Sequence, residues 1–226
     1  MLMKTFRSGL LYFLIAYICV VVELKVWGSD LHVPESRDAE RVILFLGNSL
    51  TAGYGLDISQ AFPSLIQKKI KALGWNFKVV NAGLSGETSA AGLRRIDWLL
   101  GQRIDVLVLE LGVNDGLRGV PVKATFQNLQ SLIDKVKDRY PRIRIVIAGM
   151  LLPPNLGQDY SEGFRLIFSE LAKRNQASLI PFLLQGVGGK PELNLSDGIH
   201  PTPEGHRIVA ESVWKVLRSV LKELKD

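Results

Sequence analysis

With 226 residues, 47% of them hydrophobic and 22% charged, the chain can bury one ordinary core, which excludes a disordered or fibrous protein. Its net charge of +6 lies in residues 41–226, because residues 1–40 are close to neutral. The basic residues there are spread over predicted helices, without a stripe of interleaved aromatic residues, so we expect no nucleic-acid partner. A single cysteine excludes an internal disulfide bond.

The N-terminal segment has the pattern of an export signal. Lys4 and Arg7 precede an apolar run over 10–22, which is short compared with the roughly 20 residues of a membrane-spanning helix. No A-x-A cleavage site follows, so residues 1–28 are either a cleaved signal peptide or a retained membrane anchor. Both alternatives predict a folded part outside the cytoplasm, in the periplasm or on the extracellular side. Cys19 lacks the preceding Leu of a lipoprotein site, so we expect no lipidation.

A polar segment separates this signal from the rest of the chain. Residues 29–40 contain a proline and lack periodicity, which predicts a linker before a folded domain over 41–226. In that domain short apolar runs alternate with longer amphipathic patterns, which is typical of an α/β fold with a parallel sheet. The predicted strands are 42–46, 78–81, 106–111, 144–148 and 178–181.

Prolines and capping residues mark the helices between these strands. The last helix has Thr202 as its predicted N-cap and Pro203 at its first position. The predicted helices begin near Pro63, Thr88, Pro121, Ser161 and Pro203, and the first, third and fourth of them end near Gly74, Arg139 and Asn175.

The loop after the first strand offers a nucleophile. In an open parallel sheet, ligands bind at the loops that leave the carboxyl ends of the strands. The first such loop reads Gly47-Asn48-Ser49-Leu50, and Gly47 allows a sharp turn that presents the Ser49 hydroxyl and N–H at the edge of the sheet. The alternative is that Ser49 only caps the following helix.

The loops after the second and third strands offer hydrogen-bond donors. Gly83 and Gly86 bracket a tight turn in which the Gly86 N–H can approach a ligand closely. The same residues also fit a plain glycine turn with Ser85 or Thr88 as a helix cap. Asn114 offers a side-chain amide, and its alternative role is that of a turn former.

A possible base lies near the C-terminus. Asp197 and His200 are three residues apart, so the carboxylate can accept a hydrogen bond from the imidazole and fix its tautomer. Pro201 restricts His200 to extended geometry. The alternative is an Asx turn with His200 on the surface. Of the three histidines, His32 falls in the linker and His206 in the last helix, which leaves His200 as the leading candidate.

Together these loops supply what a serine acyl-transfer site needs. Ser49 would be the nucleophile, His200 the base and Asp197 the group that orients it. The N–H groups of Ser49 and Gly86 and the amide of Asn114 would bind the oxyanion of the tetrahedral intermediate.

The four loops also resemble those of the GDSL or SGNH hydrolases, whose blocks carry Ser, Gly, Asn and His in that order. The corresponding blocks are GNSLTAGYG with Ser49, NAGLSGETSAAGL with Gly86, ELGVNDGLRG with Asn114 and DGIHP with His200. The residues around these four motifs are most similar to those of the bacterial acyl-thioesterase, lysophospholipase and arylesterase branch of the family.

This resemblance implies a flavodoxin-like, three-layer α/β/α sandwich with a five-stranded parallel sheet. It also implies hydrolysis of esters or thioesters through an acyl-enzyme, with Asp197 completing the triad and with neither a metal nor an organic cofactor. The chain departs from the family at Asn48, where the usual Asp is a structural hydrogen-bonding residue. We expect altered local electrostatics there and retained catalysis.

The substrate is less well specified. Leu50, Tyr54 and Leu84, with Leu151 and Pro153 of the loop after the fourth strand, could form an apolar groove for an acyl chain, and an ordinary surface loop is the alternative. Export would keep the enzyme away from acyl-CoA, which favours lysophospholipid, fatty-acyl or aryl esters. We expect a monomer that acts on a small acyl ester, with membrane lipid as a further possible partner.

Three other functions compete with this one. A carbohydrate O-deacetylase would use the same triad on an acetyl group. An exported binding protein would keep the fold without turnover, and Asn48 is the one feature that favours it. A metal hydrolase would use Asp197 and His200 as ligands, but the sequence supplies no further ligand cluster.

Overall fold

A five-stranded parallel sheet forms the centre of the fold, which the computed structural model describes for residues 39–225. The strand order is β2-β1-β3-β4-β5, and every neighbouring pair is parallel. All five predicted strands form, and their ends shift from the prediction by only a residue or two. The strands are β1 (Arg41–Gly47), β2 (Phe77–Gly83), β3 (Val106–Glu110), β4 (Arg144–Ala148) and β5 (Ser178–Ile180).

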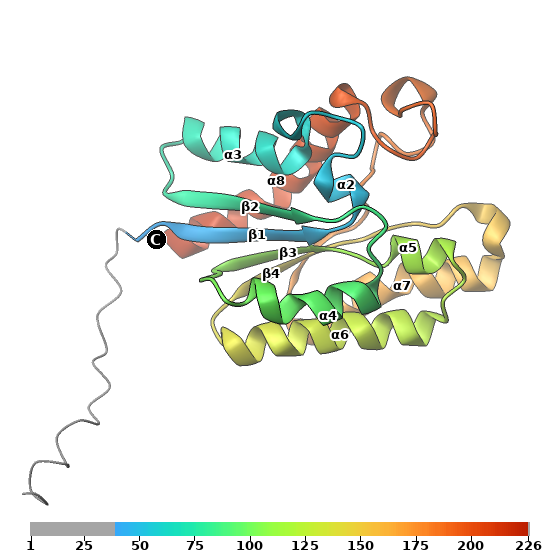
Figure 1. The fold of residues 1–226 in the computed structure, drawn as a ribbon, viewed down its shortest axis with the longest axis horizontal. Helices are drawn as coiled ribbons and strands as arrows, with labels where there is room; N and C mark the ends of the chain where they lie inside the picture. Colours follow the sequence, from blue (N-terminus) through green and yellow to red (C-terminus); the bar gives the residue numbers. More distant parts are fainter. Residues whose placement is uncertain (1–38, 226) are drawn as a thin grey trace, which may run out of the picture. The chain divides into compact units, whose positions relative to one another are not determined.

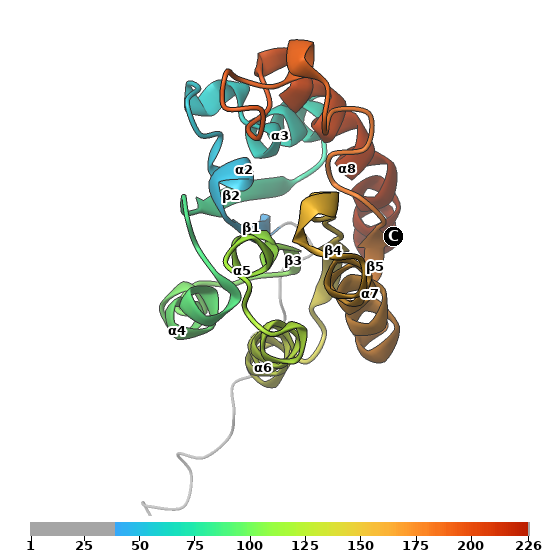
Figure 2. The same cartoon turned by 90° about the vertical axis from the view of Figure 1, so that its right-hand side faces the viewer.

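Helices cover both faces of the sheet, which gives the three layers of an α/β/α sandwich (Figures 1 and 2). One face carries α3 (Phe62–Ala72) and α8 (Pro203–Lys225), which pack side by side. The other face carries α4 (Ser89–Leu99), α6 (Val122–Arg139) and α7 (Gln158–Asn175). Short helices and turns complete the loops: α2 (Ser49–Ala52), α5 (Val113–Leu117), η2 (Ile58–Gln60), η3 (Pro154–Leu156) and η4 (Pro191–Leu193).

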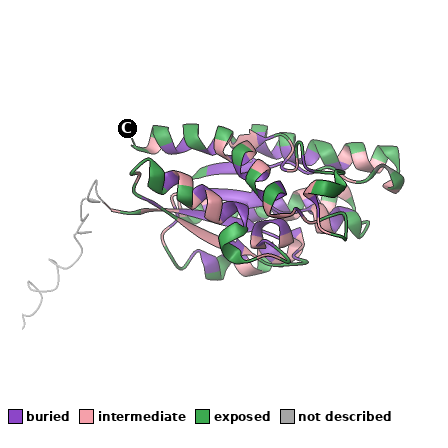
Figure 3. Cartoon of the chain, turned by 90° about the horizontal axis from the view of Figure 1, so that it is seen from above, coloured by how far each residue is buried: buried purple, intermediate pink, exposed green. Residues whose placement is uncertain are grey.

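The core lies between the sheet and these helices. Residues 43–46 of β1 and 106–109 of β3 are all buried. These strands are continuous apolar runs because helices cover both faces of the sheet. Seen from above and coloured by burial, the strands lie beneath helices whose outer faces are exposed (Figure 3).

The helix ends follow the sequence signals in most places. The Thr88 side chain caps α4, and the Thr202 hydroxyl accepts a hydrogen bond from the Gly205 N–H at the start of α8. The predicted start at Ser161 is wrong, since α7 begins at Gln158. Gly157, with φ of 93°, ends the preceding turn there, and its carbonyl accepts the Ser161 N–H.

The predicted signal or anchor over 1–28 lies outside the described residues, as does the linker over 29–40 except for its last two positions. Among the residues that the structure describes, none of the helices combines the length and the apolar character needed to cross a membrane.

Candidate active site

The turn after β1 presents Ser49 at the carboxyl edge of the sheet. Gly47 lies between Gly83 of β2 and Glu110 of β3 in the strand register. A Cβ on Gly47 would lie only 2.1 Å from Thr51 Oγ1 and 2.6 Å from Glu110 Oε2, so only glycine fits there. The sharp turn predicted from Gly47 therefore depends on a close approach rather than on an unusual backbone angle.

The cap of α2 is Asn48 and not Ser49. The Asn48 Oδ1 atom accepts the Leu50 N–H at 2.9 Å, and Ser49 is the first residue of the helix. The interpretation of Ser49 as a mere helix cap is therefore wrong, and its hydroxyl is left to interact elsewhere.

Ser49, His200 and Asp197 form a continuous chain of hydrogen bonds. The distance from Ser49 Oγ to His200 Nε2 is 2.9 Å, and that from His200 Nδ1 to Asp197 Oδ2 is 2.7 Å. The other oxygen, Asp197 Oδ1, accepts the backbone N–H groups of Ile199 and His200 at 2.9 and 3.0 Å. From the sequence, an Asx turn and an imidazole oriented by Asp197 were alternatives. In the structure, Oδ1 of Asp197 forms the turn while Oδ2 orients the imidazole.

Hydrogen bonds also keep this carboxylate charged. The backbone N–H groups of His200 and Ile199, and then the His200 side chain, lower the pKa of Asp197 to about 2. The carboxylate is therefore ionised at neutral pH and accepts a proton-bearing Nδ1. The opposite nitrogen, Nε2, is left to accept the proton of the Ser49 hydroxyl. The Tyr54 ring packs against the imidazole, with centroids 4.4 Å apart.

Gly86 and Asn114 line the same cavity as Ser49. Gly86 has φ of 78°, a conformation that favours glycine, and within the described residues its N–H makes no hydrogen bond. One N–H of the Asn114 amide donates to the Glu87 carbonyl at 2.9 Å, which fixes the amide and leaves its second N–H for a ligand. The structure thus brings together all the residues expected to bind an oxyanion.

The cavity beside Ser49 has a volume of about 700 Å³. Four of the residues expected in an acyl groove, Leu50, Tyr54, Leu151 and Pro153, line it. Leu84 does not: its side chain is half exposed, and the cavity lining excludes it. Met150 and Leu152 of the same predicted loop after β4 also line the cavity. Further apolar walls come from the loop after β5, which the sequence did not single out, namely Phe182 and Leu184.

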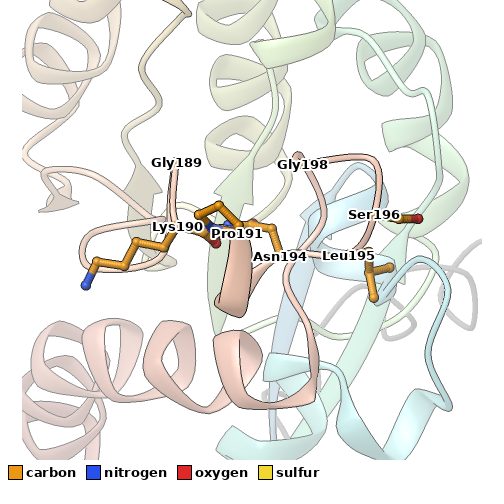
Figure 4. Close-up of a pocket in the computed structure, with 7 residues that line it drawn as sticks. All are labelled: Gly189, Lys190, Pro191, Asn194, Leu195, Ser196 and Gly198. Carbon is orange, nitrogen blue, oxygen red and sulfur yellow. Dashed lines mark hydrogen bonds between the residues drawn. The ribbon is translucent and has the colours of Figure 1, made fainter.

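A smaller pocket of about 270 Å³ adjoins this cavity. Gly189, Asn194 and Gly198 line both. Figure 4 shows its residues on one loop, with the Lys190 side chain extending away from Asn194 and Leu195. The loop that carries these residues therefore forms a wall of both pockets.

A buried carboxylate lies beneath the nucleophile turn. Glu110, at the end of β3, is 1% exposed and accepts three hydrogen bonds. Its donors are the Asn48 amide Nδ2 at 2.6 Å, the Asn48 backbone N at 3.1 Å and Thr51 Oγ1 at 2.8 Å. Burial raises the pKa of Glu110 to about 7, against the opposing effect of hydrogen bonds from Thr51 and Asn48. The sequence signal for it was a lone acidic residue at the end of an apolar strand.

His206 is buried in α8 and takes no part in this site. Its Nδ1 atom accepts the Phe62 N–H at 3.2 Å, and the ring is 1% exposed. Burial lowers the pKa of His206 to about 4, so the ring is neutral. It lies within the last helix, as predicted, and its contact with Phe62 is structural.

The described residues contain no group of three His, Cys, Asp or Glu side chains that could hold a metal ion. Among these residues, Asp197 and His200 therefore lack the third ligand that a protein metal centre commonly has.

Comparisons with known proteins agree with this geometry. Residues 45–208 match the GDSL-like Lipase/Acylhydrolase family. The chain belongs to this family. It is 40% identical over 184 residues to Esterase TesA of Pseudomonas aeruginosa, covering 81% of this chain and 90% of that protein. It is 38% identical over 186 residues to Thioesterase 1/protease 1/lysophospholipase L1 of Escherichia coli strain K12, covering 81% and 86% respectively.

A solved structure gives the same result for the fold. The crystal structure of TesA matches with a TM-score of 0.76 at 38% identity, over 79% of this chain and 99% of that chain. The resemblance stated from the four sequence blocks is confirmed, and so is the three-layer fold that it implied. The protein is accordingly an ester-hydrolysing enzyme of the GDSL-like family.

Proposed function

We propose that the protein is a serine esterase in which Ser49 is the nucleophile, His200 the general base and Asp197 the residue that orients His200. The observation that carries this proposal is the unbroken pair of hydrogen bonds, 2.9 Å from Ser49 to His200 and 2.7 Å from His200 to Asp197. A serine hydroxyl needs such a base, because it ionises far above neutral pH.

The reaction follows from these contacts. Ser49 Oγ attacks the carbonyl carbon of the ester while its proton passes to His200 Nε2. The carbonyl oxygen becomes an oxyanion held by the N–H groups of Ser49 and Gly86 and by the Asn114 amide. Collapse of this intermediate breaks the bond to the alcohol, which leaves with the proton from His200. Water then repeats the two steps on the acyl-enzyme and releases the acid.

We propose that the acyl group occupies the apolar part of the cavity. Leu151, Pro153, Phe182 and Leu184 supply apolar walls for a chain longer than acetyl. Substrates of this class are aryl esters, fatty-acyl esters and lysophospholipids, and acyl thioesters react through the same steps. The alcohol would leave on the side of His200, since that residue protonates it.

A panel of p-nitrophenyl esters from acetate to palmitate tests the substrate class. We expect kcat/KM to be higher for longer chains than for acetate, because each buried methylene contributes roughly 0.8 kcal/mol. A strict preference for acetate would favour the alternative of a carbohydrate O-deacetylase.

Labelling with a fluorophosphonate probe tests the mechanism. We expect the wild type to be labelled at Ser49 and the Ser49→Ala variant to be neither labelled nor active. Ser85→Ala is the matched control, because Ser85 lines the same cavity without a hydrogen bond to His200 among the contacts of the described residues. Equal labelling of Ser49→Ala would move the nucleophile elsewhere, and an unlabelled wild type would favour the binding-protein alternative.

We also propose that the enzyme acts outside the cytoplasm, either released from or anchored in the membrane. This rests on the basic and apolar pattern of residues 1–28. Cell fractionation tests it: the full chain should appear in the periplasmic or membrane fraction, and a chain without residues 1–28 in the cytoplasm. A full chain found only in the cytoplasm would contradict the proposal.

A further inference from the structure

We infer that Glu110 is a positioning residue for the nucleophile, and that it acts by holding Asn48 in one orientation. The inference rests on the proposed role of Ser49. Glu110 itself lies beneath the turn and is not among the residues that line the cavity.

Glu110 holds the residue before the nucleophile at two points. Its Oε1 atom accepts the Asn48 side-chain amide, and its Oε2 atom accepts the Asn48 backbone N–H. The other side of the Asn48 amide, Oδ1, accepts the Leu50 N–H. Ser49 is therefore flanked by two residues whose backbone N–H groups belong to one buried network, and its own place in the turn is fixed.

The network works only with one order of donors and acceptors. Three donors converge on Glu110, and its ionised carboxylate accepts them at both oxygens. Asn48 must donate toward Glu110 and accept from Leu50, which fixes how its amide is turned. Glu110 is 1% exposed and Asn48 is fully buried, so water cannot replace a lost partner.

A glutamine at position 110 has the right shape but cannot satisfy these groups. If its NH2 faces the Asn48 amide, two donors meet, unless that amide turns over and gives up the Leu50 N–H. If its NH2 faces the Asn48 backbone instead, it meets the N–H there. In each arrangement the turn that carries Ser49 must shift to relieve a buried, unpaired donor.

Exchanging the two groups restores the network. In the double variant Asn48→Asp with Glu110→Gln, the new amide at 110 donates to the new carboxylate at 48. That carboxylate keeps its second oxygen for the Leu50 N–H, and the Gln oxygen accepts the backbone N–H at position 48. The pair holds one carboxylate and one amide as before, so its net charge is unchanged.

The experiment measures kcat and KM per active site, with active sites counted by titration with a fluorophosphonate. For Glu110→Gln we expect kcat to fall about 10²-fold with KM changed little, because small misplacements of a reacting group have this effect. For the double variant we expect kcat to return to within about tenfold of the wild type. A kcat for Glu110→Gln close to that of the wild type, or a double variant as slow as the slower single one, would overturn the inference.

A second buried network provides the matched control. Asn175 is the last residue of α7, and its side-chain amide exchanges two hydrogen bonds with that of Gln130. Neither residue lines the cavity beside Ser49. Asn175→Ala should lower the thermal unfolding temperature and leave kcat per active site unchanged. If Glu110→Gln does not fold, the double variant still tests the pairing. It also lacks a carboxylate at position 110, so a defect caused by that loss alone would persist, whereas a defect in the pairing with position 48 would be repaired.

Failure of this inference and failure of the proposed mechanism give different results. If Ser49 were not the nucleophile, Ser49→Ala would keep its activity and its probe labelling. If only the inference is wrong, Ser49→Ala is inactive and unlabelled, and Glu110→Gln turns over normally.

Discussion

Replacing His206 with asparagine should change how the stability of the protein depends on pH. His206 is neutral in the folded protein for two reasons that the structure supplies. The ring is 1% exposed, and its Nδ1 atom already accepts the Phe62 N–H, so a proton on Nδ1 would break that hydrogen bond. Burial, with a smaller effect of the charge of His200, lowers the pKa of His206 from 6.5 to about 4.

The sign and size of the effect follow from this difference. Between pH 6.5 and 4 the unfolded chain binds a proton at His206 that the folded chain does not. The free energy of unfolding therefore falls as the pH falls through this window. The difference between the two pKa values corresponds to a contribution of about 3 kcal/mol to the free energy of unfolding. This contribution is present above pH 6.5 and is lost as the pH falls through about 4.

A second buried group acts in the opposite direction. The pKa of Glu110 is raised from 4.5 to about 7, so its protonated form stabilises the folded state at low pH, and this contribution is lost as the pH rises through about 7. The stability of the wild type should accordingly change little between pH 4.5 and 6.5. Only the difference between wild type and variant isolates His206.

Urea unfolding, followed by tryptophan fluorescence from pH 4 to 8, measures this difference. His206→Asn keeps an acceptor for the Phe62 N–H and loses the ring that stacks on Phe62, so it should be less stable at pH 8. The difference in the free energy of unfolding between the wild type and His206→Asn should decrease by about 3 kcal/mol from pH 8 to pH 4. A gap that stays constant over the whole range would refute the reasoning.

Three further variants test the site. Asn114→Ala should lower kcat by about 10²–10³, with a smaller change in KM, in steady-state assays on a p-nitrophenyl ester, since it removes one oxyanion donor. Gly47→Ala would place a Cβ 2.6 Å from Glu110 Oε2 and should prevent stable folding by circular dichroism, whereas Gly163→Ala, whose Cβ meets only ordinary contacts, should fold normally. Asn48→Asp would place a second carboxyl group at the 2.6 Å contact with Glu110, and the two groups would share one proton. The activity of this variant should fall as rising pH removes that proton. A pH–rate profile of the wild type should show no such fall.

The sheet was predictable because its strands are buried on both faces. The run from Val42 to Leu46 is entirely apolar, which is the pattern of a parallel strand buried on both faces. The start of α7 was less predictable, since it depends on the φ of Gly157 and on the turn before it. Local backbone geometry of this kind leaves little trace in an apolar pattern.

The polar site was also predictable, for a different reason. Asp197 and His200 are close in sequence, and only three histidines compete for the role of base. Ser49 and Gly86 follow consecutive strands of a parallel sheet, so their loops meet at one edge. The walls of the cavity were not predictable in this way. Leu84 was expected there and is half exposed, because the orientation of a side chain on a loop is decided by packing between distant segments.

Asn48 is the position where the sequence left an alternative open. We expected retained catalysis there, but this amide in place of the usual acid was also the one feature that favoured a binding protein without turnover. The structure supplies the missing partner, since Glu110 is 62 residues away in the chain and accepts the amide at 2.6 Å. An acid at position 48 would meet a second acid there, whereas the amide donates to it without needing a shared proton. Asn48 is thus compatible with an ordered nucleophile turn, although the family usually has an Asp there. The hydrogen bond to Glu110 therefore removes the main argument for a binding protein that has lost catalysis.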